Sequence, residues 1–207
     1  MVQRVVLFLL VVAMACAASD NNYSSTSDKS WDLPANAKLE IHVTNADVHV
    51  NPGKEPKVAV HVLARSSVRN FVVHSSFEMR GSTGVLRITQ PPRGGDVTVE
   101  VTVPSGTDLT LRGSAGDIDV NLPGGSKDIE TSAGDVMLTI GNSKQYSTID
   151  ASTRAGDITA PECAKVTQKS DNSLQCEGEG KDLIRVHTKA GDVTLREGGN
   201  GSSMARE

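Results

Sequence analysis

Ser114-Ala-Gly-Asp-Ile118 is the first of four closely similar phrases in this chain of 207 residues. The other copies are Ser132-Ala-Gly-Asp-Val136, Arg154-Ala-Gly-Asp-Ile158 and Lys189-Ala-Gly-Asp-Val193. After each Gly-Asp pair, aliphatic residues follow at alternate positions, which is the pattern of a strand with one buried face. Each phrase is therefore expected to be a turn that leads directly into a strand. Repetition of one turn phrase indicates stacked repeating units.

The spacing of the repeated aspartates favours a parallel β-helix or β-roll. Asp117, Asp135, Asp157 and Asp192 are separated by 18, 22 and 35 positions. An interval of about twenty residues suits one coil, which stacks on its neighbour and buries a ladder of aliphatic side chains. We therefore expect an all-β fold, a single-stranded parallel β-helix or β-roll with coils of about 18–22 residues. A β-sandwich made of hairpins is the alternative.

Other stretches bear on how regular the stack is. Asn45-Ala-Asp47 and Asp96 resemble weaker copies of the phrase, and Ser170-Asp-Asn-Ser-Leu174 as a degenerate copy would divide the longest interval into two coils. Segment 66–82 has looser spacing, and it is expected to form strands of the first coils or an antiparallel cap. A cap is expected because the open end of a β-helix exposes unpaired backbone groups. Regular stacking is least expected between residues 161 and 181, where the repeat pattern is lost.

The first 18 residues are expected to be an export signal peptide. Arg4 supplies the positive start, and residues 5–12 form an apolar stretch that is too short to span a bilayer. Cleavage after Ala17 would release a soluble protein, whereas lipidation of Cys16 after cleavage just before it would give a bacterial lipoprotein. Both outcomes stay open, and both predict an exported protein that is periplasmic, on the cell surface or secreted.

Composition divides the rest of the chain into three parts. Residues 19–36 are rich in Ser, Asn and Asp, and they are expected to be a flexible polar linker. The patterned region 37–197 is expected to be the β-helical domain. The Gly- and Ser-containing tail 198–207 is expected to be disordered.

Two cysteines lie outside the signal peptide. Cys163 and Cys176 are an even pair in an exported chain, for which disulfides are permitted. A bridge between them would close a loop of about fourteen residues and stabilise the fold by about 3 kcal/mol. We expect this disulfide, with two buried free thiols as the alternative. No second Cys pair or His lies near them at zinc-ligand spacing, so no zinc site is expected.

A family resemblance is carried by Val103-Pro-Ser-Gly-Thr-Asp-Leu-Thr-Leu111, which leads into the first of the Ala-Gly-Asp phrases. Together these motifs resemble the bacterial "putative adhesin" family. The resemblance spans about residues 37–196 and is clearest over 97–160. It implies an exported β-helical domain of unknown function, and it brings no catalytic residues.

The repeated aspartates have a structural interpretation and a ligand-binding one. At a corner, Gly adopts a left-handed conformation without steric cost, and Asp accepts hydrogen bonds from nearby backbone N–H groups. Alternatively, Asp117, Asp135, Asp157 and Asp192 form a column of carboxylates about 4.8 Å apart, and calcium binds if enough oxygens converge. Neighbouring carboxylates in water would repel by only about 0.9 kcal/mol, so the column needs no cation. The corner is therefore the preferred interpretation, with no metal and no cofactor expected.

Composition and motifs favour a non-catalytic protein. The net charge of -4 and the aromatic content of 3% argue against a nucleic-acid partner, which needs a basic field and stacking side chains. The chain contains no Gly-x-Ser-x-Gly, His-Glu-x-x-His or phosphate-loop motif. The five histidines are scattered, and the outward side of strands is their expected place. They are His42, His49, His61, His74 and His187.

These observations predict an exported cell-envelope protein, either adhesin-like or a structural β-helical scaffold, that is not an enzyme. Its expected partner is a cell-surface or extracellular protein or glycan, and it would contact a membrane only through a lipid anchor at Cys16. A Ca²⁺-dependent or carbohydrate-binding module is the first alternative. A polysaccharide-acting enzyme that uses Asp117 and Asp119 is the second. The pattern leaves the oligomeric state open.

Overall fold

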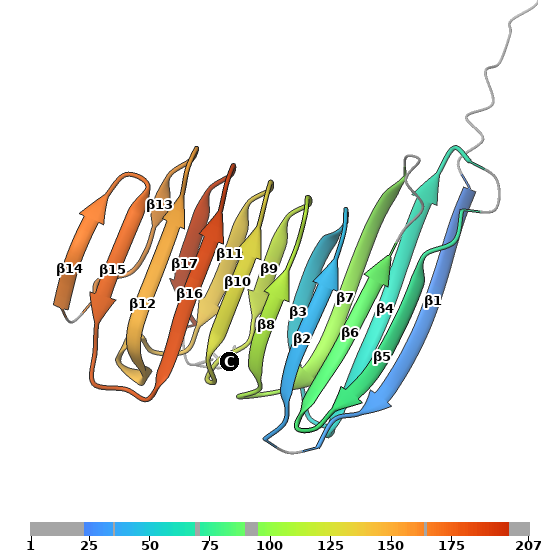
Figure 1. Cartoon of the computed structure of the whole chain (residues 1–207), viewed down its shortest axis with the longest axis horizontal. Coiled ribbons are helices and arrows are strands. Elements are labelled where there is room, and N and C mark those ends of the chain that lie inside the picture. Colours follow the sequence, from blue (N-terminus) through green and yellow to red (C-terminus); the bar gives the residue numbers. More distant parts are fainter. Residues whose placement is uncertain (1–22, 35, 69–70, 90–94, 164, 199–207) are drawn as a thin grey trace, which may run out of the picture.

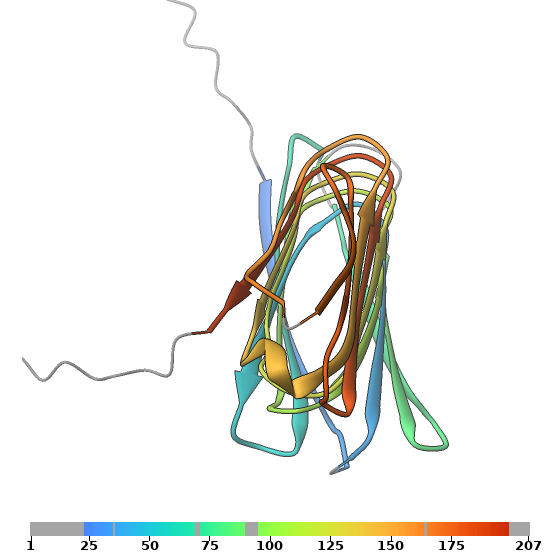
Figure 2. The ribbon, with the colours of Figure 1, turned by 90° about the vertical axis from the view of Figure 1, so that its left-hand side faces the viewer.

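The structure is a computed structural model that describes residues 23–34, 36–68, 71–89, 95–163 and 165–198. In these ranges, seventeen strands form two sheets that lie face to face (Figure 1). Viewed along the stack, the chain winds around a flattened ring with one sheet on each long side (Figure 2). The prediction of an all-β fold is confirmed. The described ranges contain no helix with the length and hydrophobicity needed to cross a membrane.

Six strand pairs alternate between the two sheets. In each pair, a strand of the nine-stranded sheet (sheet B) is followed in the chain by a strand of the eight-stranded sheet (sheet A). The pairs are β2 (Lys38–Val43) with β3 (Asp47–Gly53), β6 (Thr83–Thr89) with β7 (Asp96–Pro104), β8 (Asp108–Arg112) with β9 (Ile118–Asn121), β10 (Lys127–Thr131) with β11 (Val136–Ile140), β12 (Tyr146–Thr153) with β13 (Ile158–Thr159), and β16 (Asp182–Thr188) with β17 (Val193–Glu197).

These coil-like pairs are parallel to their neighbours but are not stacked in chain order. The strand order is β6-β2-β8-β10-β16-β12 in sheet B and β7-β3-β9-β11-β17-β13 in sheet A. The last coil, β16–β17, therefore lies between β10–β11 and β12–β13 (Figure 1). The finer prediction of a single parallel β-helix is not confirmed, because its coils would follow one another along the chain. All coils present similar corners and aliphatic ladders, so the repeat pattern does not say which coils are neighbours.

Antiparallel strands close both ends of the stack. They are β1 (Tyr23–Asp32), β4 (Lys57–Ser66), β5 (His74–Arg80), β14 (Lys165–Ser170) and β15 (Ser173–Glu177). The hairpin of β5 and β6 provides the antiparallel cap expected within 66–82. Ser170–Leu174 does not form a coil of its own but spans the turn of the β14–β15 hairpin, although Asp171 O accepts from Ile158 N–H at 2.9 Å, as the corner aspartates do from the neighbouring coils. Asp96 begins β7 opposite Arg65, outside the line of the repeated aspartates.

Part of the predicted flexible linker is a strand. β1 pairs with β4 over ten residues, and Trp31 stacks on Phe77 with ring centroids 5.4 Å apart. Leu33, which follows β1, is fully buried. Without β1, the backbone groups along the outer edge of β4 would be unpaired. Polar composition suggested flexibility, but backbone pairing at an edge needs few apolar side chains.

The core lies between the sheets as ladders of aliphatic side chains. One ladder in sheet B consists of Ile41, Leu111, Ile129, Val186 and Ala151. The facing ladder in sheet A contains Val50, Val120, Leu138 and Leu195. Burial of each Val, Leu or Ile side chain stabilises the fold by about 1.5–3 kcal/mol. A one-residue slip would turn these side chains to solvent, so the ladders fix the register of every coil.

Candidate functional site

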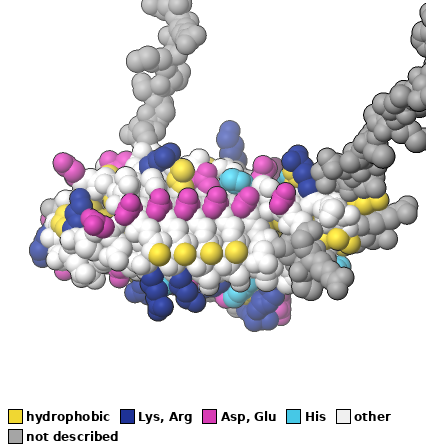
Figure 3. Space-filling model, turned by 90° about the horizontal axis from the view of Figure 1, so that it is seen from above, with side chains coloured by type: hydrophobic (Ala, Val, Ile, Leu, Met, Phe, Trp, Pro, Cys, Tyr) yellow, Lys and Arg dark blue, Asp and Glu magenta, His cyan; other side chains and the backbone are white. Residues whose placement is uncertain are grey.

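The Ala-Gly-Asp phrases form one edge of the stack, where the chain passes from sheet B to sheet A. Figure 3 shows this edge from above as a line of acidic side chains with a line of hydrophobic ones beside it. The repeated aspartates lie in the spatial order Asp47, Asp117, Asp135, Asp192 and Asp157. The weaker copy that ends in Asp47 is therefore a true member of the set. The order of the coils, rather than the order of the chain, decides which aspartates are neighbours.

Each aspartate binds the backbone of the next coil. Oδ1 of Asp117 accepts a hydrogen bond from the N–H of Asp135 at 2.9 Å, and Oδ1 of Asp135 accepts one from Asp192 at 2.8 Å. The same contact joins the remaining two neighbouring pairs, Asp47 with Asp117 at 3.0 Å and Asp192 with Asp157 at 2.9 Å. A charged acceptor strengthens such a bond relative to a neutral one. The aspartates thus form a hydrogen-bonded column, which we call the aspartate ladder.

A glycine precedes four of the five ladder aspartates and allows the coils to approach closely, whereas Ala46 precedes Asp47 at the end of the ladder. Gly116, Gly134, Gly191 and Gly156 have φ angles of 108°, 112°, 128° and 145°, which side chains rarely allow. A Cβ at any of them would lie 2.2 Å from a carbonyl oxygen of the neighbouring coil. Only glycine therefore fits at these four positions.

Buried threonines support the corner from inside. Thr131 and Thr188 are aligned across β10 and β16, and each donates its hydroxyl to the carbonyl two residues ahead at 3.2 Å. Thr153 donates to Gly191 O at 3.0 Å, so it connects two coils. In this corner, Oδ1 of four ladder aspartates and the hydroxyls of the three threonines are therefore hydrogen-bonded to the backbone. Among the described residues, no three His, Cys, Asp or Glu side chains are gathered closely enough to hold a metal ion.

The opposite edge contains a buried ammonium group that sequence analysis missed. Lys127 is fully buried at a position whose ladder neighbours are Leu109 and Ile184. Its Nζ donates to the carbonyls of Thr107, at 3.3 Å, and Gly125, at 3.0 Å, and also to that of Gly124. Burial lowers the pKa of Lys127 to about 8, although Asp108 and Asp182 oppose the shift. The alternation with Ile129 and Thr131 was the signal that Lys127 points inward.

A groove of about 790 Å³ runs along this edge, outside Lys127. Two aspartates on its wall cap backbone N–H groups of the corner: Asp108 accepts from Ser126 at 2.8 Å, and Asp182 accepts from Gly125 at 3.0 Å. These carboxylates resemble the aspartate ladder in what they do, since both bind the N–H of a neighbouring coil. The groove is lined by four glycines and by polar or charged side chains, with Ala37 as its one apolar side chain among the described residues.

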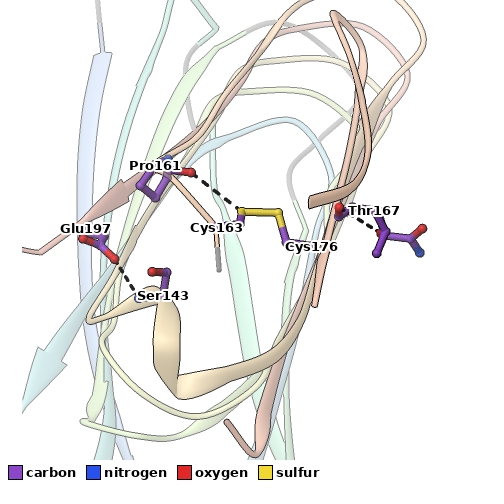
Figure 4. Close-up of a disulfide and its surroundings, with 7 residues drawn as sticks. Ser143, Pro161, Cys163, Thr167, Cys176 and Glu197 are labelled. Atoms are coloured by element: carbon purple, nitrogen blue, oxygen red, sulfur yellow. Dashed lines mark hydrogen bonds between the residues drawn. A yellow bond between two sulfur atoms is a disulfide. The ribbon is translucent and has the colours of Figure 1, made fainter. Parts of the chain in front are cut away.

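The expected disulfide closes one end of the stack. Cys163 and Cys176 are bonded, with Cα atoms 6.0 Å apart, which fits ordinary disulfide geometry (Figure 4). The bond joins the segment after β13 to β15. Nearby, the N–H of Ser143, in the short helix η1 (Ser143–Gln145), donates to Glu197 at 2.9 Å, and the bond to Ser143 lowers the pKa of Glu197. Cys16, the predicted lipidation site, lies outside the described residues.

Histidines on the outer faces lie beside carboxylates. On sheet A, His61 contacts Asp28 at 2.6 Å, and this hydrogen bond raises the pKa of His61. His49 lies 3.9 Å from Asp119, so Asp119 does not join Asp117 in the aspartate ladder. The side chains of His49 and His61 are 42% and 43% exposed, so their predicted outward orientation is confirmed.

Comparisons with known proteins give one family and a shared fold. A family model described as Toastrack DUF4097 matches residues 93–196, about half of the chain. A solved structure described as a "putative cell adhesion protein" from Clostridium sporogenes superposes with a TM-score of 0.58 at 12% identity, covering 85% of this chain and 100% of that one. A "putative adhesin" from Bacteroides fragilis has a TM-score of 0.32 at 9% identity, covering 83% and 97%. No curated protein matches the sequence.

Proposed function

We propose, from the premise that this chain belongs to the Toastrack DUF4097 family, that it is an exported, non-catalytic, adhesin-like protein of the cell envelope. A solved structure that shares its fold is described as a "putative cell adhesion protein", and we take that role as the proposed one. Fold alone does not fix function, so the proposal also needs support from the surface.

One observation carries this proposal: the stack presents two broad sheet faces to solvent, while its repeated corners are satisfied internally. Outward positions on sheet A hold polar residues such as His49, Glu100 and Asn51, whereas the alternate positions are buried valines. Carboxylates of the aspartate ladder accept hydrogen bonds from backbone N–H groups. A rigid frame with exposed polar faces suits contact with an extended surface partner.

Three measurements test the proposal. Protease treatment of intact cells should degrade the protein, and the purified mature chain should bind saturably to at least one class of extracellular glycan or matrix protein on an array. Cells that lack the protein should adhere less to that same surface. Protection from protease on intact cells together with no saturable binding would contradict the adhesin-like role.

A further inference from the structure

Three basic side chains lie side by side on the outer face of sheet B. The register places His42 of β2 opposite Arg87 of β6 on one side and Arg112 of β8 on the other. They lie near the ends of their strands, beside a cavity of about 280 Å³. Thr44, Thr89 and Ser114 also line this cavity and bring hydroxyl groups to it.

The three basic groups differ in whether they are paired. Arg112 forms two side-chain hydrogen bonds with Asp128, at 3.1 and 2.8 Å, and lies 3.6 Å from Glu130. His42 contacts Glu40 at 2.5 Å. Arg87 has no ion pair in the described structure. Its Nη1 is buried and has no acceptor among the described residues.

A buried guanidinium N–H without an acceptor is destabilising, because it has lost its water and gained nothing in return. Arginine is never deprotonated in proteins, so a change of protonation cannot relieve this cost. An oxyanion can. The planar fork of a guanidinium matches two oxygens of a carboxylate, sulfate or phosphate, and such charge-assisted pairs are strong.

We propose that Arg87 and this cavity bind the carboxylate or sulfate group of an acidic glycan. Arg87 holds the anionic group, and the hydroxyls of Thr44, Thr89 and Ser114 bind the sugar hydroxyls around it. A cavity of about 280 Å³ has room for a single sugar-sized group. The site rests on its own geometry, and the choice of a glycan as the carrier rests on the proposed adhesin-like role.

Charge and composition favour a glycan over other polyanions. The chain has a net charge of -4, so it lacks the broad basic field that attracts nucleic acid. His42, the basic neighbour of Arg87, is held by Glu40, and Arg112, on the far side of His42, is held by Asp128. Among the described residues that line this cavity, Arg87 is the one cationic side chain without an ion pair, which suits one anionic group on an otherwise neutral, hydroxyl-rich molecule.

The test follows the arginine Nε–Hε signals of the mature protein by NMR, at constant ionic strength. The titrants are sodium sulfate, a glucuronic-acid disaccharide, a sulfated disaccharide and a neutral disaccharide. Addition of sulfate or of either acidic sugar should shift the Arg87 signal saturably, and the neutral sugar should leave it unchanged. Arg87→Gln should weaken binding of the acidic sugars by about tenfold or more. Arg185→Gln, on an exposed arginine of the same sheet, is the matched control and should leave the affinity unchanged.

Each outcome decides the proposal. Loss of binding in Arg87→Gln but not in Arg185→Gln supports the site, provided that the thermal midpoint of the unliganded Arg87→Gln protein is equal to or above that of the wild type. No saturable shift with any anion, or equal binding by Arg87→Gln, would overturn the site. Binding of inorganic sulfate alone would overturn the glycan as its carrier. Surface adhesion that survives Arg87→Gln together with unchanged binding of the acidic sugars would leave the adhesin-like role standing while refuting this site.

Discussion

At the scale of single residues, Lys127 shows how a β-stack tolerates a charge in its core. Its aliphatic stem continues the ladder between Leu109 and Ile184, and its ammonium reaches the corner carbonyls of Thr107 and Gly125. Those carbonyls would otherwise be buried without donors, which costs free energy. Lys127 therefore donates hydrogen bonds to backbone carbonyls at this edge of the stack, and the aspartate ladder accepts hydrogen bonds from backbone N–H groups at the other edge.

The buried ammonium predicts an unusual dependence of stability on pH. The folded protein releases the Lys127 proton near pH 8, whereas the unfolded chain holds it to about pH 10.5. Between these values the unfolded state binds more protons, so stability rises with pH. Relative to Lys127→Met, the wild type should gain about 3 kcal/mol between pH 7 and 10.5, as measured by urea unfolding. A difference between the two proteins that does not change with pH would refute the lowered pKa.

Replacement of a ladder glycine by alanine should lower the stability more than the same replacement at a glycine with open space around it. Gly134→Ala combines a φ of 112° with a Cβ placed 2.2 Å from the carbonyl oxygen of Gly116, so it should cost about 3 kcal/mol or more. Gly106→Ala is the matched control. Gly106 also has a positive φ, of 76°, but nothing lies within 4 Å of its Cβ, and the cost should be about 1 kcal/mol. Thermal or urea unfolding measures both, and equal costs would mean that close approach between coils is unimportant.

Sequence reasoning at this scale succeeded where a residue type has one dominant use. The repeated Gly-Asp phrase predicted a corner, and the even pair of cysteines predicted the bond between Cys163 and Cys176, which is present. It failed for Lys127 and Arg87, because charged residues are ordinarily placed on the surface. Strict alternation with Ile129 indicated the inward direction of Lys127. Nothing in the sequence indicated that Arg87 would lack a partner.

At the scale of elements, the aspartate ladder explains why the same phrase recurs. Each carboxylate accepts a hydrogen bond from a backbone N–H of the next coil, and the glycine of that coil allows the close approach, so aspartate and glycine support the stack together. The ladder therefore favours repetition of the complete phrase without any ligand. This argument concerns the contact between coils, whereas the sequence interpretation had the aspartates bonding within their own turns.

Substitution of Asp135 distinguishes this contact from a cation site. Asp135→Asn keeps an oxygen for the N–H of Asp192 and should change stability little, whereas Asp135→Ala should cost about 1 kcal/mol. Calcium and EDTA should leave the thermal midpoint of the wild type unchanged. A midpoint that rises with calcium in the wild type but not in Asp135→Asn would instead indicate a cation in the ladder.

The hairpin of β14 and β15 depends on its disulfide more than the coils do. β14 is exposed along its whole length and pairs only with β15, and Cys176 in β15 is tied to Cys163. Removal of the bond with Cys163→Ala and Cys176→Ala should stabilise the unfolded chain by about 3 kcal/mol in the chain-entropy view. The loss should appear first as faster hydrogen exchange in β14 and β15, with β10 unchanged. Uniform acceleration across the stack would show that the hairpin unfolds only with the whole molecule.

At the scale of the whole molecule, the order of the coils was beyond the reach of the sequence. The alternating aliphatic residues and the repeated corner predicted strands and stacking correctly, because both depend on local pattern. Which two coils become neighbours depends on how well their aliphatic side chains pack, and every coil presents nearly the same set of aliphatic side chains. The chain therefore gives no local signal that its last coil, β16–β17, lies in the interior of the stack.

This topology makes the C-terminal coil structurally central, which predicts the effect of truncation. β16 pairs with both β10 and β12, and β17 pairs with both β11 and β13. Removal of residues 182–207 would leave β12 without its parallel partner and would expose the ladder that ends at Ile129 and Leu138. The β12–β15 segment should then become sensitive to protease, while the coils from β2 to β11 keep their pairing.

A chain ended after residue 198 is the control, because it keeps all seventeen described strands and should unfold as the full chain does. Limited proteolysis with mass spectrometry would locate the cleavage sites in both truncated proteins. In a stack built in chain order, loss of the last coil would remove only one end and leave β12–β15 protected. Protection of β12–β15 in the shorter protein would therefore contradict the interior position of β16–β17. Cleavage confined to β12–β15 would show that β16–β17 holds the β12–β15 segment to the coils from β2 to β11.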